Sequence, residues 1–92
     1  MKATLILRQR TDLGDTFVEL VIWQLPRKLP GSEHRYKYRL ALVKRGICVV
    51  RYDNEAGKGD HRHAGQKEEP YGFTDLDTLI RDFREAVKEY LR

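Results

Sequence analysis

Residues 35–52 read Arg35-Tyr36-Lys37-Tyr38-Arg39-Leu40-Ala41-Leu42-Val43-Lys44-Arg45-Gly46-Ile47-Cys48-Val49-Val50-Arg51-Tyr52, and this stretch decides the fold. Every second residue from Tyr36 to Leu42 is aromatic or aliphatic, and the alternate positions begin with the cations Arg35, Lys37 and Arg39. This is the two-residue period of a strand with one buried face. Lys44-Arg45-Gly46 supplies a tight turn into a second apolar run. The stretch therefore predicts a β-hairpin with strands over 35–43 and 47–52, whose exposed face carries a cationic stripe.

Two further strands are predicted upstream, over 2–9 and 16–25. Both segments are rich in β-branched and aromatic residues, and the turn-forming Asp12-Leu13-Gly14-Asp15 lies between them. The second segment is apolar on both faces, which favours a central place in the sheet. Pro26 and Pro30 then end the strand, because proline has no N–H to donate to a ladder.

The C-terminal segment predicts an amphipathic helix over 74–91. Apolar side chains recur there at helical spacing, at Leu76, Leu79, Ile80, Phe83, Val87, Tyr90 and Leu91. Thr74 is the expected N-cap, with Asp77 three residues later. The apolar stripe is expected to cover one face of the sheet, because the sheet has nothing else to pack against.

Residues 53–72 contain four glycines and almost no apolar side chains. They predict a long polar loop, in which His61-Arg62-His63 forms a short extended piece. The whole pattern predicts a single α+β domain over 1–92, with an antiparallel meander of four to five strands and one C-terminal helix packed on one face.

Composition limits the class of protein. The 92 residues are 40% hydrophobic and 35% charged, a balance typical of a soluble folded domain. The single cysteine, Cys48, cannot form an internal disulfide and lies in an apolar run, so we expect it in the core. No segment approaches the roughly 20 apolar residues of a membrane span, and we expect a cytoplasmic protein with no membrane contact.

Charge is unevenly divided between the two halves of the chain. Residues 1–52 carry eleven Lys or Arg against four acids, and residues 53–92 carry seven against ten, for a net charge of +4. A basic strand half would attract RNA or an acidic protein segment, although a merely basic surface would have the same composition.

Side chains that could take part in catalysis are most concentrated between Arg51 and His63. His61 and His63 stand two residues apart, so in an extended segment both rings leave the same side. Such a pair can take the proton of a ribose 2′-hydroxyl and return one to the leaving 5′-oxygen. In this interpretation the phosphate is bound by Arg51, Lys58 and Arg62, an imidazole is oriented by Asp53 or Asp60, and neither a metal nor another cofactor is needed.

Other residues could extend this surface toward RNA. Lys37 and Arg39 belong to the cationic stripe, and Tyr71 follows Pro70 in the polar segment, where its ring could stack on a base. Gly57-Lys58-Gly59 lacks the spacing of a P-loop, so nucleoside triphosphate binding is not expected.

Two alternatives for the histidines stay open. They could bind a metal with Asp60 or Asp53, although this set needs a fourth ligand and His34 lies in a distant loop. They could also be structural, with the acids and histidines pairing with arginines to hold a polar loop on the sheet.

The stretch 51–63, followed by Glu69-Pro70-Tyr71 and Phe73, resembles the signature of the TumE family of toxin–antitoxin proteins. Trp23-Gln24-Leu25-Pro26, Pro30-Gly31-Ser32 and Tyr36-Lys37-Tyr38-Arg39-Leu40 are also similar to that family. The resemblance implies a prokaryotic toxin encoded beside a helix-turn-helix antitoxin, and it carries no assigned catalytic residues.

By analogy with other small toxins, such as the RelE-like ribonucleases, the resemblance favours metal-independent RNA cleavage. The alternative is a non-enzymatic module that acts through protein or nucleic-acid contacts. An exposed edge strand would also permit a homodimer.

Overall fold

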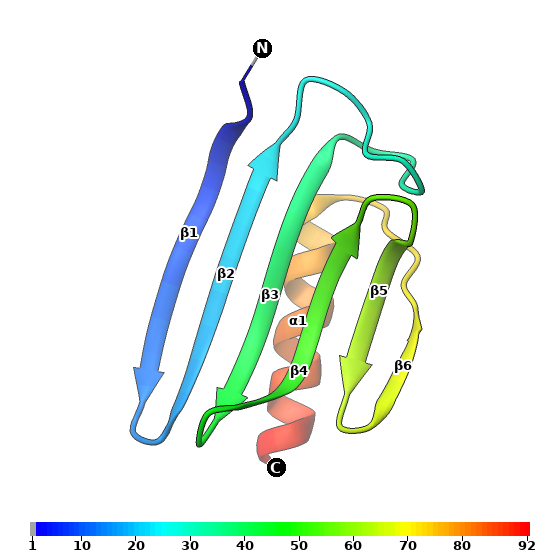
Figure 1. Ribbon diagram of the computed structural model, residues 1–92. Coiled ribbons are helices and arrows are strands. Elements are labelled where there is room, and N and C mark those ends of the chain that lie inside the picture. The colour runs from blue at the N-terminus through cyan, green and yellow to red at the C-terminus, as the bar shows by residue number, and fades with distance from the viewer. Residues whose placement is uncertain (1) are drawn as a thin grey trace.

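The computed structural model describes residues 2–92, within which the chain forms six strands and one helix. The elements are β1 (Thr4–Leu13), β2 (Thr16–Gln24), β3 (Tyr36–Lys44), β4 (Ile47–Glu55), β5 (Gly59–Ala64), β6 (Lys67–Pro70) and α1 (Leu76–Leu91). Each strand pairs antiparallel with its neighbour in the chain (Figure 1). The predicted α+β meander with a C-terminal helix is confirmed, but the sheet has six strands rather than four to five.

The additional strands come from residues 53–72, where the prediction of a polar loop was wrong. The segment completes β4 and then forms β5 and β6, with Asp53 opposite His61 and His63 opposite Glu68. These strands are polar on both faces, so they lack the alternation of hydrophobicity by which strands are recognised. Instead, side chains of opposite charge face each other on neighbouring strands. The Arg62 Nε of β5, for example, lies 2.7 Å from a Glu69 oxygen of β6.

β1 also differs from its prediction over 2–9, because it continues to Leu13 and the turn begins at Gly14. Gly14 has a φ of 75°, which glycine adopts without steric cost. A register shift between Leu5 and Leu7 interrupts the pairing with β2, and every β1 residue except Leu7 is exposed. β1 is therefore a long, open edge strand.

The N-cap of the helix lies one residue later than predicted, at Asp75 rather than at Thr74. The Asp75 carboxylate accepts a hydrogen bond from the Thr78 amide at 2.7 Å. Leu79 and Phe83 are fully buried over the sheet. Their partners in the core are Leu20, Ile22, Tyr38, Leu40, Leu42, Val50 and Tyr52. Among residues 2–92, no helix has the length and hydropathy to cross a membrane.

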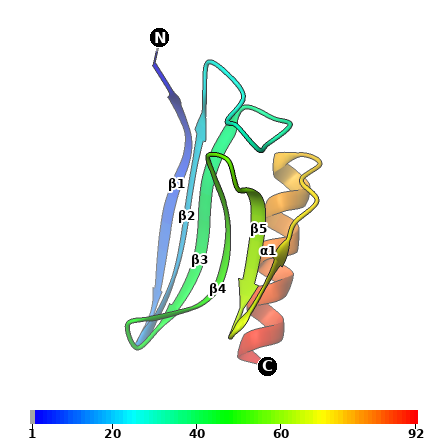
Figure 2. The ribbon, with the colours of Figure 1, turned by 45° about the vertical axis from the view of Figure 1, so that its right-hand side comes forward.

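The helix covers one face of the sheet and leaves the other open, as the two views in Figures 1 and 2 show. Because side chains alternate along a strand, Tyr52 and Asn54 of β4 point to the helix face. Arg51 and Asp53 then point to the open face. This division separates the polar residues of β4 and β5 into two groups.

Candidate functional site

The open face brings together the residues of the histidine cluster, which we define as Arg51, Asp53, Lys58, His61, His63 and Glu68. The strand register places Asp53 opposite His61 and Arg51 opposite His63, and directly opposed residues share a face. His63 in turn is opposite Glu68 of β6. Three neighbouring strands thus present their polar side chains to one patch.

Glu68 lies between the two imidazoles. Its two carboxylate oxygens are each 3.7 Å from a ring nitrogen, Oε1 from the His61 Nδ1 and Oε2 from the His63 Nδ1. The Lys58 ammonium is 2.8 Å from Oε1. This hydrogen bond, with the neighbouring imidazoles, holds the pKa of Glu68 below its usual range, and the same contact raises the pKa of Lys58. Glu68 is therefore a charged carboxylate facing both rings.

The other nitrogen of each ring has a different partner. The His61 Nε2 is 2.7 Å from the Lys58 carbonyl oxygen, which only accepts, so this nitrogen donates. The His63 Nε2 is 2.9 Å from the Arg51 guanidinium, which only donates, so this nitrogen accepts. The two rings thus differ in their hydrogen bonding, since the His61 Nε2 donates and the His63 Nε2 accepts, while the His61 Nδ1 is buried without a hydrogen-bond partner.

The cluster is accessible from solvent on the open face. The His61 and His63 side chains are 18% and 21% exposed, and the Arg51 Nε lies 3.2 Å from an Asp53 oxygen. A separate hollow of about 420 Å³ beside the β4–β5 turn is lined by His61 and Lys58 and also by His34, Asp60 and Phe73 of the helix side. A space of this volume is in the range of small-ligand sites.

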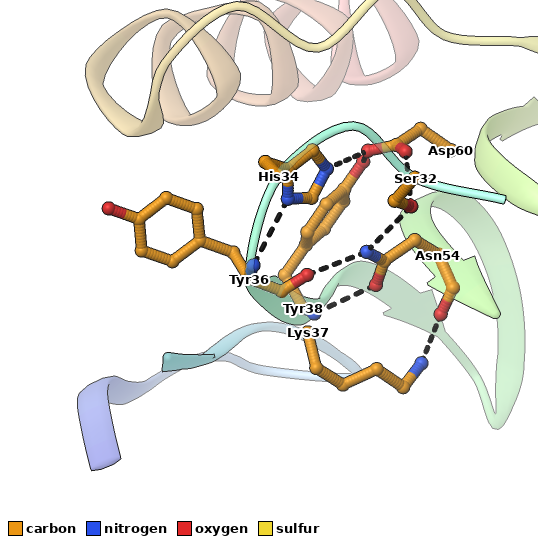
Figure 3. A network of polar contacts seen from close by, with 7 residues as sticks. All are labelled: Ser32, His34, Tyr36, Lys37, Tyr38, Asn54 and Asp60. Carbon is orange, nitrogen blue, oxygen red and sulfur yellow. Dashed lines mark hydrogen bonds and ion pairs between the residues drawn. The ribbon is translucent and has the colours of Figure 1, made fainter. Parts of the chain in front are cut away.

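On the helix face of the same strands, Asp60 is the centre of a second polar group, the Asp60 network (Figure 3). Its carboxylate accepts three hydrogen bonds of 2.7 Å, from the Ser32 hydroxyl, the His34 Nε2 and the Tyr38 hydroxyl. The His34 Nδ1 accepts from the Tyr36 amide at 3.1 Å, and the ring packs on Phe73 with centroids 3.8 Å apart. Burial, followed by the bond to Asp60, raises the pKa of Tyr38.

Two sequence-based expectations are corrected by this arrangement. His34 is not distant from the 51–63 stretch, because the loop over 25–35 folds back and places its ring against Asp60. Asp60 contacts His34 rather than His61, which points to the opposite face. Among residues 2–92, no group of three His, Cys, Asp or Glu side chains is arranged to hold a metal ion.

Asn54 extends the β3–β4 ladder by means of its side chain. Its amide oxygen accepts from the Tyr38 N–H at 3.1 Å, and its amide nitrogen donates to the Tyr36 carbonyl at 2.7 Å. The backbone carbonyl of Asn54 accepts from the Lys37 ammonium. The fully buried Asn54 side chain thus provides hydrogen-bond partners for the β3 backbone where β4 no longer pairs with it.

Glycines allow the turn between β4 and β5 to touch the 25–35 loop. The Gly57 N–H donates to the Pro30 carbonyl at 2.6 Å, and a Cβ on Gly59 would lie 2.8 Å from the Gly31 oxygen. The Lys58 N–H donates to the Glu55 carbonyl at 3.1 Å. The Gly57 and Lys58 amides are therefore occupied, and Gly59 is the glycine of this turn whose lack of a side chain permits the close backbone contact.

The remaining predicted RNA-contacting residues are divided between the faces. Arg62 lies on the helix face, paired with Glu69, and the Tyr71 hydroxyl donates to Asp82 at 2.7 Å. Burial and this bond raise the pKa of Tyr71. Lys37 and Arg39 lie on the open face, where the register sets Arg39 opposite Asp53.

Glu68 is the cluster residue that the sequence analysis missed. The signal was present, because Gly65-Gln66 can turn a hairpin and Glu68 and Glu69 then fall opposite His63 and Arg62. Facing charges of opposite sign would have indicated the strand pair even without hydrophobic alternation.

Comparison with known proteins agrees with the resemblance noted in the sequence. No curated protein and no solved structure shows a significant match to the chain. A family model described as toxin TumE matches residues 2–91, which is nearly the whole chain. The protein with this open-faced sheet and histidine cluster therefore belongs to the TumE family of toxins.

Proposed function

We propose that this toxin is a metal-independent endoribonuclease whose reaction is carried out by His61 and His63. The observation that carries the proposal is that both imidazoles stand on the open sheet face, on either side of one charged carboxylate, with Arg51 and Lys58 within contact distance. Paired proton donors and acceptors beside fixed cations are what cleavage of a phosphodiester requires.

The roles follow from the hydrogen bonds of the two rings. When a phosphate takes the Arg51 guanidinium, the His63 Nε2 lone pair becomes free to accept the proton of the 2′-hydroxyl. The 2′-oxygen then bonds to phosphorus and the bond from phosphorus to the 5′-oxygen breaks. His61, protonated on both ring nitrogens, releases the Lys58 carbonyl and gives its Nε2 proton to that 5′-oxygen. The products are a 2′,3′-cyclic phosphate and a 5′-hydroxyl, while Glu68 stabilises positive charge on either ring.

The open face beside the cluster suits an RNA backbone. Lys37 and Arg39 continue the row of cations across β3, and the register sets Trp23 opposite Lys37. Farther along the face, Arg8 lies over the Trp23 ring and Arg10 over the Phe17 ring, at 5.8 and 3.7 Å from the ring centroids. Cations interleaved with aromatic rings are typical of surfaces that bind single-stranded RNA.

A toxin of this family implies an antitoxin partner. We expect that partner to be of the helix-turn-helix type, as the family resemblance implies, and to act in the cytoplasm of a prokaryotic cell. A partner that covers the positively charged open face would block RNA and the cluster together.

The test is RNA cleavage by the purified protein in excess chelator, with detection of 2′,3′-cyclic phosphate ends. We expect the wild type to cleave, and His61→Ala and His63→Ala each to lower the rate by about 100-fold or more. Lys67→Ala is the matched control, because Lys67 is exposed and belongs to the same hairpin but not to the cluster. Circular dichroism should show the same fold in all four proteins.

The outcomes separate the competing functions. Cleavage that needs a divalent ion would favour a metal site, and full activity of both histidine variants would place the active site elsewhere. If no RNA is cut under any condition, the protein is a binding module that acts by surface contact.

A further inference from the structure

The outer edge of β1 is the longest open strand edge among residues 2–92. β1 pairs only with β2, so along Thr4–Leu13 the N–H and C=O groups that point away from β2 have no partner strand. Leu5, Ile6 and Leu13 on it are 43%, 44% and 50% exposed. Proteins usually shorten, cover or pair such an edge.

Pairing of this edge with that of a second copy is tightly restricted. A two-fold axis normal to the sheet makes the two β1 strands antiparallel and keeps both open faces on one side. Residues that lie directly opposite each other must be on the same face of the sheet. The two-fold axis therefore has to set one β1 residue opposite the same residue of the second copy. Only a few registers remain, and the charges on β1 distinguish them.

The register centred on Arg10 is the one that the side chains favour. It sets Arg8 opposite Asp12 and Leu7 opposite Leu13, each twice, with Gln9 opposite Thr11. The two Arg10 side chains meet at the axis, but each already pairs with its own Asp12 at 3.2 Å and lies over Phe17. This register therefore matches charge at Arg8 and Asp12 and apolar surface at Leu7 and Leu13, while Leu5 and Ile6 lie beyond it.

The neighbouring registers are worse. An axis through Gln9 opposes Arg8 and Arg10 twice, and like charges directly across a ladder are destabilising. An axis through Arg8 opposes Arg8 to itself and runs across the bulge between Leu5 and Leu7. An axis through Thr11 uses only residues 9–13. The favoured register uses residues 7–13, which is the regular part of β1 beyond the bulge.

We propose that two copies of this chain associate through β1 in the register centred on Arg10, forming one continuous sheet across the dimer. The two open faces then merge into a single surface, with the histidine clusters on β5 at its far ends. This assembly does not depend on RNA cleavage, so it stands or fails separately from the proposed function.

Charge exchange tests the register. In analytical ultracentrifugation, the wild type should sediment with twice the 10.9 kDa chain mass. Arg8→Asp and Asp12→Arg should each weaken dimerisation by at least about tenfold, because each opposes like charges twice. The double variant Arg8→Asp/Asp12→Arg should dimerise again, and an equimolar mixture of the two single variants should form a heterodimer.

A second measurement covers variants that fold poorly. In a Cys48→Ser background, Arg10→Cys should crosslink between copies with a short bis-maleimide, and Arg8→Cys should do so much less. A wild type that stays monomeric at about 100 µM, which is roughly 1 mg/mL for a chain of 10.9 kDa, would overturn the proposal. Equal dimerisation of the wild type and both single charge variants would overturn it as well.

Discussion

The two faces of the β4–β5 hairpin carry polar clusters of opposite character. On the helix face, Asp60 accepts three hydrogen bonds of 2.7 Å and its side chain is only 9% exposed. On the open face, the two imidazoles stand 3.7 Å from Glu68 and are about twice as exposed as Asp60. Alternate residues of the same strands thus form a closed network and an accessible one.

This contrast indicates which face of the sheet carries the function. A buried polar group that holds several short hydrogen bonds inside the protein contributes mainly to stability. Longer contacts and partial exposure leave the histidine cluster able to exchange partners. The comparison predicts that substitutions on the helix face lower stability, while those on the open face lower activity.

The largest loss of stability is expected for Asn54→Ala. This substitution leaves the Tyr38 N–H and the Tyr36 carbonyl without partners next to a fully buried side chain. We expect the free energy of unfolding to fall by about 3 kcal/mol. Chemical denaturation measures this, with exposed Glu55→Ala as the control that should change little. A loss below about 1 kcal/mol would contradict the role of Asn54 in the ladder.

The next effect is a difference in stability between Gly59→Ala and Gly65→Ala, with Gly59→Ala losing more. Both glycines have positive φ, at 83° and 61°, so both variants bear the backbone cost of an L-residue, about 1 kcal/mol. Only at Gly59 would the new Cβ meet another backbone, 2.8 Å from the Gly31 oxygen, whereas nothing lies within 4 Å at Gly65. We expect Gly59→Ala to be the less stable by about 2 kcal/mol in thermal unfolding. Equal stabilities would mean that the two loops separate without cost.

The smallest effect on stability is expected for Glu68→Gln, since this carboxylate is exposed and its pairs are on the surface. Its effect should appear in RNA cleavage, which we expect to fall roughly 10- to 100-fold as the imidazoles lose their shared anion. Glu68→Asp should recover part of the rate. Unchanged cleavage by Glu68→Gln would remove Glu68 from the site.

The sequence was most informative where one face of a strand is apolar. The hairpin over 35–52 and the helix stripe ending at Leu91 follow directly from hydrophobic periodicity, and the structure confirms both within a few residues. β5 and β6 were missed because ion pairs such as Arg62–Glu69 replace that periodicity. The helix start was misplaced by the choice between Thr74 and Asp75, which have similar capping chemistry.

The candidate site was partly predictable. The shared side of His61 and His63 follows from their spacing, and the opposite direction of Arg62 follows from the same rule. The contact between His34 and Asp60 spans 26 residues and depends on how the 25–35 loop folds back, which no local pattern reveals. The proton-transfer roles of His61 and His63 and the orienting role of Asp53 stay predictions, whereas Asp60 contacts the His34 ring.

The order of strands in the sheet is the same as their order in the chain, from β1 to β6. Each ladder can therefore close as soon as its two segments exist, and the longest connection that has to be closed is the one over 25–35. Short closures cost little chain entropy, so such a topology lowers the kinetic barrier to folding. During synthesis, all three strands of the histidine cluster emerge before the helix, so Leu79 and Phe83 of α1 are the last core residues to be added.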